Sequence, residues 1–210
     1  MGPFVRVTSV YLIRHGETTW NAERRLQGTM DAPLSDREQR QVRRLVDALR
    51  HAPLAAVYSS PLQRAQETAQ ALAEAHRLPL ILADDLRELN QGEWESRLLD
   101  EVAAQDGARL QAWWDSPHTA RMPGGESLLE VQDRALRAFW DLVARHQGQT
   151  IALVAHGGVN KTVLLALLGA PLASYWRVRQ SNACINVVEV DTVQPRVITL
   201  NETAHLGADG

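Results

Sequence analysis

Residues 11–21 read YLIRHGETTWN, an apolar run that ends abruptly in a cation and an imidazole. The run belongs to the apolar, β-branched segment from Val7 to Ile13, whose composition is typical of a strand covered on both faces. Arg14 and His15 then lie at the carboxyl end of this predicted strand. An arginine there needs an anion, either a carboxylate of the protein or a ligand, because an unpaired buried charge is costly.

Strand and helix patterns alternate through the rest of the chain. Further strands are predicted at residues 54–58, 80–82, 150–155, 184–190 and 196–200. Helical patterns occur at residues 36–52, 65–72, 128–142 and 159–168. This alternation predicts an α/β fold, a three-layer α/β/α sandwich whose central sheet is mainly parallel, with room for one late antiparallel strand.

Length and composition favour one domain over residues 1–210, with 45% hydrophobic residues available for its core. Residues 90–125 have weaker periodicity and are predicted to form an excursion or lid, and the tail after Thr203 is predicted to fray. Trp113 and Trp114 within the excursion could line the mouth of a site or pack in the core.

Charge and cysteine usage exclude several classes of protein. A net charge of −3 and a pI near 6.2 give no field that attracts nucleic acid. The single cysteine, Cys184, cannot form an intramolecular disulfide and is a poor start for a zinc site. No apolar run is long enough to span a bilayer. The sequence predicts a cytoplasmic protein that binds neither membrane nor nucleic acid, and it leaves the oligomeric state open, a homodimer included.

Two of the seven histidines, His15 and His156, follow apolar strands and precede a glycine. In an open α/β sheet the functional crevice lies beyond the carboxyl ends of the strands, so these two are candidate functional residues. Arg64 follows a Ser-Ser-Pro break at the start of a helix, where free backbone N–H groups favour anions. A surface location for Arg64 is the alternative.

These residues fall within motifs that resemble the histidine phosphatase superfamily, which includes the phosphoglycerate mutases and related phosphatases. The motifs are RHGET at 14–18, Asn21, QGTMDAPLS at 27–35, YSSPLQRAQETA at 58–69, LRELNQGEWE at 86–95, PGGES at 123–127 and VAHGG at 154–158. Their order and spacing extend the resemblance over nearly the whole chain.

The resemblance implies that His15 is a nucleophile that forms a phosphohistidine. Arg14 and Arg64 would bind the phosphoryl oxygens, and His156 would stabilise the transferring group. The further substrate-binding residues that it implies are Asn21, Gln27, Gly28 and Gly157.

Glu88 matches the general acid of the family, which protonates the leaving oxygen and later activates water. A salt bridge to Arg87 or Arg64 is the structural alternative, and spacing alone cannot choose Glu88 over Glu93 or Glu95. The resemblance implies no cofactor and no metal, because arginines and histidines supply the positive charge.

Two positions depart from the family pattern, which commonly has glycine where Glu38 and Ser96 stand. Glu38 follows Ser35 at the spacing of a helix capping box, which suggests a local change. Ser96 lies nearer the expected pocket, where a changed backbone would affect the fit of the substrate.

The segment from Arg97 to Gly125 is compact and holds only three arginines, whereas the mutases carry a longer basic insertion. This favours hydrolysis of small phosphomonoesters, with α-ribazole phosphatase and sugar phosphate phosphatase activities among the candidates. A phosphoglycerate mutase is the alternative enzyme. A non-catalytic phosphate-binding module is the alternative from another class, although it would have no need of a nucleophile and an acid.

Overall fold

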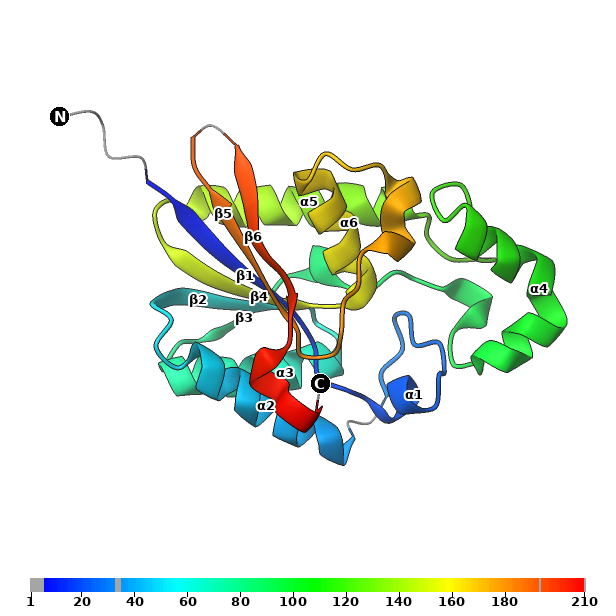
Figure 1. The fold of residues 1–210 in the computed structure, drawn as a ribbon, viewed down its shortest axis with the longest axis horizontal. Coiled ribbons are helices and arrows are strands. Elements are labelled where there is room, and N and C mark those ends of the chain that lie inside the picture. Colours follow the sequence, from blue (N-terminus) through cyan, green and yellow to red (C-terminus); the bar gives the residue numbers. More distant parts are fainter. Residues whose placement is uncertain (1–5, 33–34, 193, 210) are drawn as a thin grey trace.

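A computed structural model describes residues 6–32, 35–192 and 194–209 and shows a six-stranded sheet between two layers of helices (Figure 1). The strands are β1 (Thr8–Arg14), β2 (Leu54–Ser59), β3 (Leu80–Leu82), β4 (Thr150–Ala155), β5 (Ile185–Val190) and β6 (Pro195–Glu202). The α-helices are α1 (Thr19–Ala22), α2 (Asp36–Leu49), α3 (Gln63–His76), α4 (Leu99–Asp115), α5 (Leu128–Arg145) and α6 (Gly157–Leu167). Short 3₁₀ helices are η1 (Asp84–Leu86), η2 (Gly92–Trp94), η3 (Leu172–Arg177) and η4 (Ala204–Asp209).

The strands lie in the order β3-β2-β4-β1-β5-β6. The pairs β1–β4, β2–β4 and β2–β3 are parallel, whereas β5 is antiparallel to both of its neighbours. The predicted mainly parallel sheet with one late reversed strand is therefore confirmed.

Alternation of side chains along the central strands builds both faces of the core. Leu12 of β1 and Leu153 of β4 belong to the cluster that includes residues of α5 and α6. Their chain neighbours Ile13 and Val154 belong to the cluster that includes residues of α2 and α3. Figure 1 shows these two helix pairs on opposite sides of the sheet, which confirms the predicted three-layer sandwich.

The predicted excursion contains η2 and α4. Val102 and Leu110 of α4 are buried in the larger core cluster. Trp113 is also buried, with its ring centroid 5.4 Å from that of Tyr175, whereas Trp114 is 44% exposed. The first of the two tryptophans is therefore a core residue.

The predicted fraying after Thr203 is wrong for residues 204–209, and Gly210 lies outside the described residues. These six residues form η4, which packs against α2. Leu206 is fully buried there, and Arg44 of α2 donates a hydrogen bond to its carbonyl. The tail is docked by the burial of Leu206, which removes apolar surface from water, together with this hydrogen bond.

No helix within residues 6–32, 35–192 and 194–209 combines the length and apolar character needed to cross a bilayer. The Cys184 thiol is buried and free.

Leu206→Ala is expected to lower the free energy of unfolding by roughly 2–5 kcal/mol, because it removes a fully buried side chain. Urea denaturation would measure the change. Leu168→Ala, at a position that is 52% exposed, is the matched control and should cost less than about 0.5 kcal/mol. Equal small effects at both positions would show that the tail does not contribute to stability.

Candidate active site

The register of two parallel strands brings His15 and His156 together. Arg14 at the end of β1 pairs with Ala155 at the end of β4, so the next residue of each strand leaves the sheet at the same place. The two imidazole centroids lie 5.1 Å apart, and both side chains are buried. The prediction that each histidine follows the carboxyl end of a strand is confirmed.

The ring of His15 is oriented by the backbone carbonyl of the next residue, Gly16. Its Nδ1 lies 2.6 Å from the Gly16 carbonyl oxygen, which can only accept, so Nδ1 carries the proton and Nε2 keeps a free lone pair. Burial, followed by the charges of Arg64 and Arg14, lowers the pKa of His15 well below its ordinary value. His15 is therefore neutral at pH 7, the form that a nucleophile requires.

Arg14 and Arg64 are held by backbone carbonyls rather than by strong ion pairs. Arg14 Nη1 donates to the carbonyl of Gln180 at 2.6 Å. Arg64, at 1% exposure, donates to the carbonyls of Gly28 and Met30, each at 2.7 Å. The Nε–H of each guanidinium is buried without a hydrogen-bond partner. Two positive charges thus keep a donor free for an added anion.

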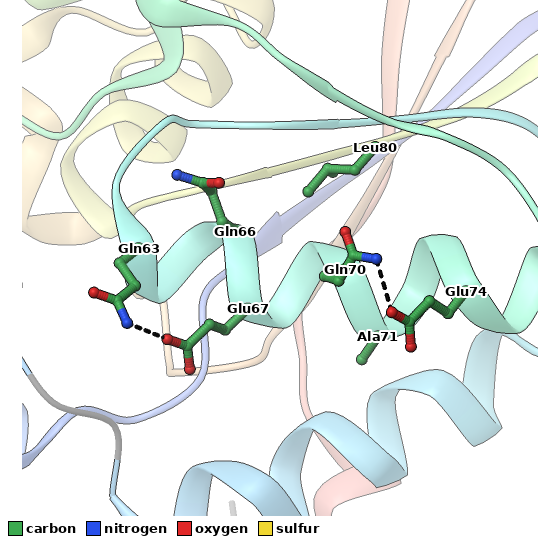
Figure 2. Close-up of a pocket in the computed structure, with 7 residues that line it drawn as sticks. All are labelled: Gln63, Gln66, Glu67, Gln70, Ala71, Glu74 and Leu80. Carbon is green, nitrogen blue, oxygen red and sulfur yellow. Dashed lines mark hydrogen bonds between the residues drawn. The ribbon is translucent and has the colours of Figure 1, made fainter.

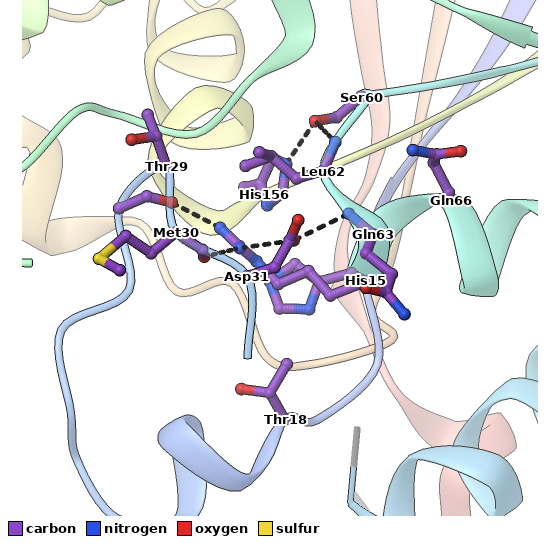
Figure 3. Close-up of polar contacts among 12 residues, drawn as sticks. His15, Thr18, Thr29, Met30, Asp31, Ser60, Leu62, Gln63, Gln66 and His156 are labelled. Atoms are coloured by element: carbon purple, nitrogen blue, oxygen red, sulfur yellow. Dashed lines mark hydrogen bonds and ion pairs between the residues drawn. The ribbon is translucent and has the colours of Figure 1, made fainter. Parts of the chain in front are cut away.

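Arg64 has one nearby carboxylate, which does not neutralise it. Asp31 Oδ1 lies 3.7 Å from Arg64 Nη1, and this carboxylate is 43% exposed. Asp31 also accepts the backbone N–H of Gln63 at the start of α3, at 2.8 Å (Figure 3). Solvent screens such a distant, exposed pair, so Arg64 remains a strong cation at the site. The alternative of a surface location for Arg64 is wrong, because its side chain is almost completely buried.

A cavity of about 160 Å³ lies at the carboxyl ends of β1 and β4. Its lining is Arg14, His15, Asn21, Arg25, Leu26, Gln27, Gly28, Arg64, Glu88 and Gln91. Seven of the nine residues predicted for the site are in this set. His156 lies behind His15, and Gly157 borders Arg14, whose Nε would be 3.5 Å from a Cβ added to that glycine.

Asn21 and Gln27 add neutral polar groups to this cavity. The Oδ1 of Asn21 accepts hydrogen bonds from the Thr18 backbone and hydroxyl and from Asn182, all at 3.1 Å. This fixes the amide so that its Nδ2 remains available as a donor. Gln27 has an Oε1 that is buried without a partner. Both side chains can therefore bond to a polar ligand.

His156 is fully buried, and its Nε2 lies 2.8 Å from Ser60 Oγ (Figure 3). Ser60 Oγ already accepts the N–H of Leu62, and its own proton can be donated to Nε2. The proton of His156 then resides on Nδ1, which is buried without a partner. Burial, followed by the charge of Arg64, lowers the pKa of His156 well below its ordinary value. A neutral His156 therefore lies beside His15.

Glu88 crosses from its loop to the N-terminus of α6. Its Oε2 accepts the N–H of Gly158 at 3.0 Å, and its Oε1 accepts the N–H of Val159 at 3.2 Å and of Leu89 at 2.9 Å. Arg87 pairs with Asp84 instead, at 2.7 Å, so the alternative of a salt bridge to Arg87 is wrong. The free N-terminal amides of the helix position this carboxylate within the cavity.

The two neighbouring glutamates are not among the residues that line the cavity. Glu95 accepts the Thr29 N–H at 2.8 Å and the Gln91 N–H at 3.0 Å. Its Oε1 would lie 2.0 Å from a Cβ on Gly28, which has φ of +54°, so only glycine fits there. Glu93 is exposed. The tertiary structure separates three glutamates that spacing could not distinguish.

Arg134 of α5 is a supporting residue that sequence reasoning missed. Its guanidinium donates to the carbonyls of Asp85, Arg87 and Glu88 at 2.8, 2.7 and 3.1 Å. It also pairs with Glu126 at 2.9 Å. Arg134 therefore anchors the loop that carries Glu88. A charged residue next to the apolar helix positions 131 and 135 was the available signal.

Ser96 adopts the left-handed conformation, with φ of +65°. Its N–H donates to the carbonyl of Leu26 at 2.8 Å, and its carbonyl accepts from Arg25 at 2.7 Å. The backbone here thus keeps a conformation that suits glycine, at a cost of roughly 1–2 kcal/mol for serine. The expectation that Ser96 changes the loop backbone is therefore not supported.

The predicted capping box of α2 is only half correct. Ser35 Oγ accepts the N–H of Glu38 at 3.2 Å, as expected. The N–H of Ser35, however, donates to the Glu17 carbonyl at 3.2 Å, and Glu38 turns inward until it is 3% exposed. The reciprocal bond is absent because its donor already has another acceptor.

Glu38 lies directly behind the loop that follows His15. Thr68 Oγ1 accepts the N–H of Gly16 at 3.1 Å and lies 3.3 Å from Glu38 Oε1 and 3.1 Å from the Arg64 carbonyl. The hydroxyl has one proton, which it can donate to either of these two oxygens. Burial raises the pKa of Glu38 to about 7, although the hydrogen bond from Thr68 opposes the shift.

A larger depression lies along α3 (Figure 2) and does not fit an anion. Its volume is about 530 Å³, and its lining is Gln63, Gln66, Glu67, Gln70, Ala71, Glu74 and Leu80. The two carboxylates accept hydrogen bonds from glutamines at 2.6 and 2.7 Å. This lining is acidic and has no cation, so the smaller cavity is the candidate site.

No group of three or more histidine, cysteine, aspartate or glutamate side chains within the described residues is arranged to hold a metal ion.

The sequence model of the histidine phosphatase superfamily (branch 1) matches residues 10–203. Phosphoserine phosphatase 1 of Hydrogenobacter thermophilus is 34% identical over 96% of this chain and 95% of its own length. A probable phosphoglycerate mutase, GpmB of an Enterobacter species, is 34% identical over 86% of this chain and 84% of its own length.

Solved structures show the same fold. Bacillus stearothermophilus YhfR superposes with a TM-score of 0.91 at 36% identity, covering 95% of this chain and 99% of its own. An α-ribazole phosphatase from Shigella flexneri superposes with a TM-score of 0.84 at 29% identity, covering 92% and 96%.

Glu38→Gln is expected to make stability less dependent on pH. The pKa of Glu38 rises from 4.5 to about 7 on folding, so its stabilising contribution is full below pH 4.5 and declines as pH rises through 7. The neutral amide should therefore be more stable than the wild type at pH 8.5, with a smaller difference at pH 5.

Urea midpoints at the two pH values would measure this effect. Glu93→Gln, at an exposed position, is the matched control and should leave the pH dependence unchanged. An unchanged pH dependence in Glu38→Gln would contradict a protonated Glu38.

Proposed function

The chain belongs to the histidine phosphatase superfamily, branch 1, since the family match spans residues 10–203, and we propose that it hydrolyses small phosphomonoesters through a phosphohistidine on His15. One observation carries the proposal. A buried neutral imidazole with a free Nε2 lies beside two guanidiniums whose Nε–H donors lack partners. A dianionic phosphoryl group would satisfy those donors and meet the nucleophile at once.

In the first step, His15 Nε2 attacks phosphorus and the bond from phosphorus to the leaving oxygen breaks. Glu88 donates its proton to that oxygen, so that a neutral alcohol departs. Arg14, Arg64 and His156 stabilise the charge on the non-bridging oxygens.

In the second step, a water molecule attacks the phosphohistidine. Glu88, now a carboxylate, accepts a proton from that water, and the bond between phosphorus and His15 Nε2 breaks. Inorganic phosphate leaves, and both residues return to their starting states. The amide contacts of Glu88 at the start of α6 suit this carboxylate form.

Hydrolysis is favoured over mutase activity by the arginines of the excursion. Arg97 donates to Gln105 at 2.8 Å, Arg109 pairs with Asp106 at 3.4 Å, and Arg121 pairs with Glu130 at 3.2 Å. All three are engaged near their own segment and none lines the cavity. The further arginine of the lining, Arg25, donates to Glu23 and to the Ser96 carbonyl. A doubly phosphorylated mutase cofactor would need additional free cations in the cavity. The relative named a probable mutase keeps that activity as the second candidate.

The substrate is proposed to be a small metabolite, because the cavity holds only about 160 Å³. Phosphoserine phosphatase and α-ribazole phosphatase are names of relatives, and substrates of those kinds are candidates here. Release of inorganic phosphate without a bisphosphorylated primer would identify a hydrolase, and transfer between 3- and 2-phosphoglycerate would identify a mutase.

His15→Ala is expected to abolish turnover of p-nitrophenyl phosphate, because no other group can form the covalent intermediate. A stopped reaction of the wild type should contain an acid-labile phosphoprotein, and the variant should not. A wild type with neither turnover nor phosphoprotein would instead indicate a binding module. Retained turnover in the variant would contradict the assignment of His15.

Glu88→Gln is expected to slow hydrolysis of alkyl phosphates by about 10²–10⁴-fold and of aryl phosphates by less. An alkoxide is a poor leaving group that requires protonation, whereas a phenolate can depart without it. Initial rates with glycerol phosphate and p-nitrophenyl phosphate would measure the two effects. The matched control is Glu93→Gln on the same loop, which should retain activity. Equal slowing of both esters by Glu88→Gln would contradict the assignment of Glu88 as the general acid.

A further inference from the structure

Lys161 is the one lysine among the 22 lysine and arginine residues of the chain. It lies on α6 four residues after Gly157, and residues four apart share one face of a helix. Gly157 borders Arg14, whose Nε would be 3.5 Å from an added Cβ. The side chain of Lys161 therefore leaves α6 on the face that carries the phosphate-binding groups.

Two aromatic rings hold the amine. Lys161 Nζ lies 4.6 Å from the ring centroid of Tyr175 and 4.6 Å from that of Trp176. The Tyr175 hydroxyl in turn reaches the site, since a Cβ on Gly158 would lie 3.2 Å from it and 2.4 Å from Glu88 Oε1. The aromatic pair thus holds the amine beside Tyr175, whose hydroxyl borders Glu88, just outside the residues that line the cavity.

No carboxylate of the described chain forms an ion pair with this amine. Burial, followed by the charge of Arg14, lowers the pKa of Lys161 to about 8, and Glu88 opposes the shift. The amine is therefore mainly protonated at pH 7. A half-buried cation without an anion is costly, and the two rings offset only part of that cost.

We propose that Lys161 binds a carboxylate of the substrate, so that the enzyme prefers phosphomonoesters that carry a carboxylate close to the phosphoryl group. This inference rests on the proposed hydrolase function. A single compact ammonium matches a singly charged carboxylate, whereas a second phosphate would be better matched by the fork of a guanidinium. Lys161 would act as a specificity residue and take no part in the proton transfers.

The competing explanation is a structural latch, in which the cation only joins α6 to η3. Lys161→Met separates the two explanations, because methionine keeps the length of the side chain and packs well on aromatic rings. A structural role would change the hydrolysis of every ester alike. A carboxylate subsite would change KM only where the ester carries the carboxylate.

The experiment compares O-phosphoserine with O-phosphoethanolamine, two alkyl phosphates that differ by one carboxylate. The wild type should hydrolyse phosphoserine with the higher kcat/KM. Lys161→Met should raise KM for phosphoserine about ten- to hundredfold more than for phosphoethanolamine, with little effect on the ratio of the kcat values. Lys161→Arg should restore part of the preference, and Arg50→Met, at an exposed site, is the control for a lost surface cation.

Three results would overturn the inference. They are equal kcat/KM for the two esters in the wild type, a preference that survives in Lys161→Met, and an equal loss on both esters. In each case, turnover of p-nitrophenyl phosphate by the wild type would still support the proposed hydrolase function. A wild type that hydrolyses none of the three esters would overturn the proposed function itself.

Discussion

The site depends on the parallel register of β1 and β4. Because Arg14 pairs with Ala155, the two strands end level, and each delivers a histidine to the same point beyond the sheet. A shift of one residue would send one imidazole to the opposite face, since side chains alternate along a strand. The apolar residues of these strands pack against helices on both sides, so the core that stabilises the fold also fixes the distance between the two histidines.

The electrostatic properties of the site depend on the burial of its charged and titratable side chains. Carbonyl groups hold the two guanidiniums without cancelling their charge, and burial together with those charges keeps the pKa of His15 low. The result is a neutral nucleophile next to unsatisfied positive donors. That arrangement is costly in the free protein and is relieved by a phosphoryl group, because the anion replaces the water lost on folding. Glu88 stays apart from the arginines through its bonds to the amides of α6.

The two departures from the family pattern differ in kind. Ser96 occupies a left-handed position and stores local strain, while its backbone hydrogen bonds remain intact. Glu38 instead introduces a buried carboxyl behind Gly16, and its effect is tied to its proton. Neither side chain lines the cavity. Arg134 supports the loop that carries Glu88 by donating hydrogen bonds to its backbone carbonyls.

The sequence by itself determined the strands, the sheet type and the two histidines, because apolar runs that end in His-Gly are local signals. The tail after Thr203 and the reciprocal cap of Glu38 were mispredicted, since Leu206 and Glu38 found partners distant in the chain. Only the tertiary structure decided which glutamate lines the cavity, that Arg64 is buried, and that Lys161 lies on aromatic rings beside the site. Those features depend on contacts between residues far apart in sequence, and no local pattern encodes which of several identical side chains makes them.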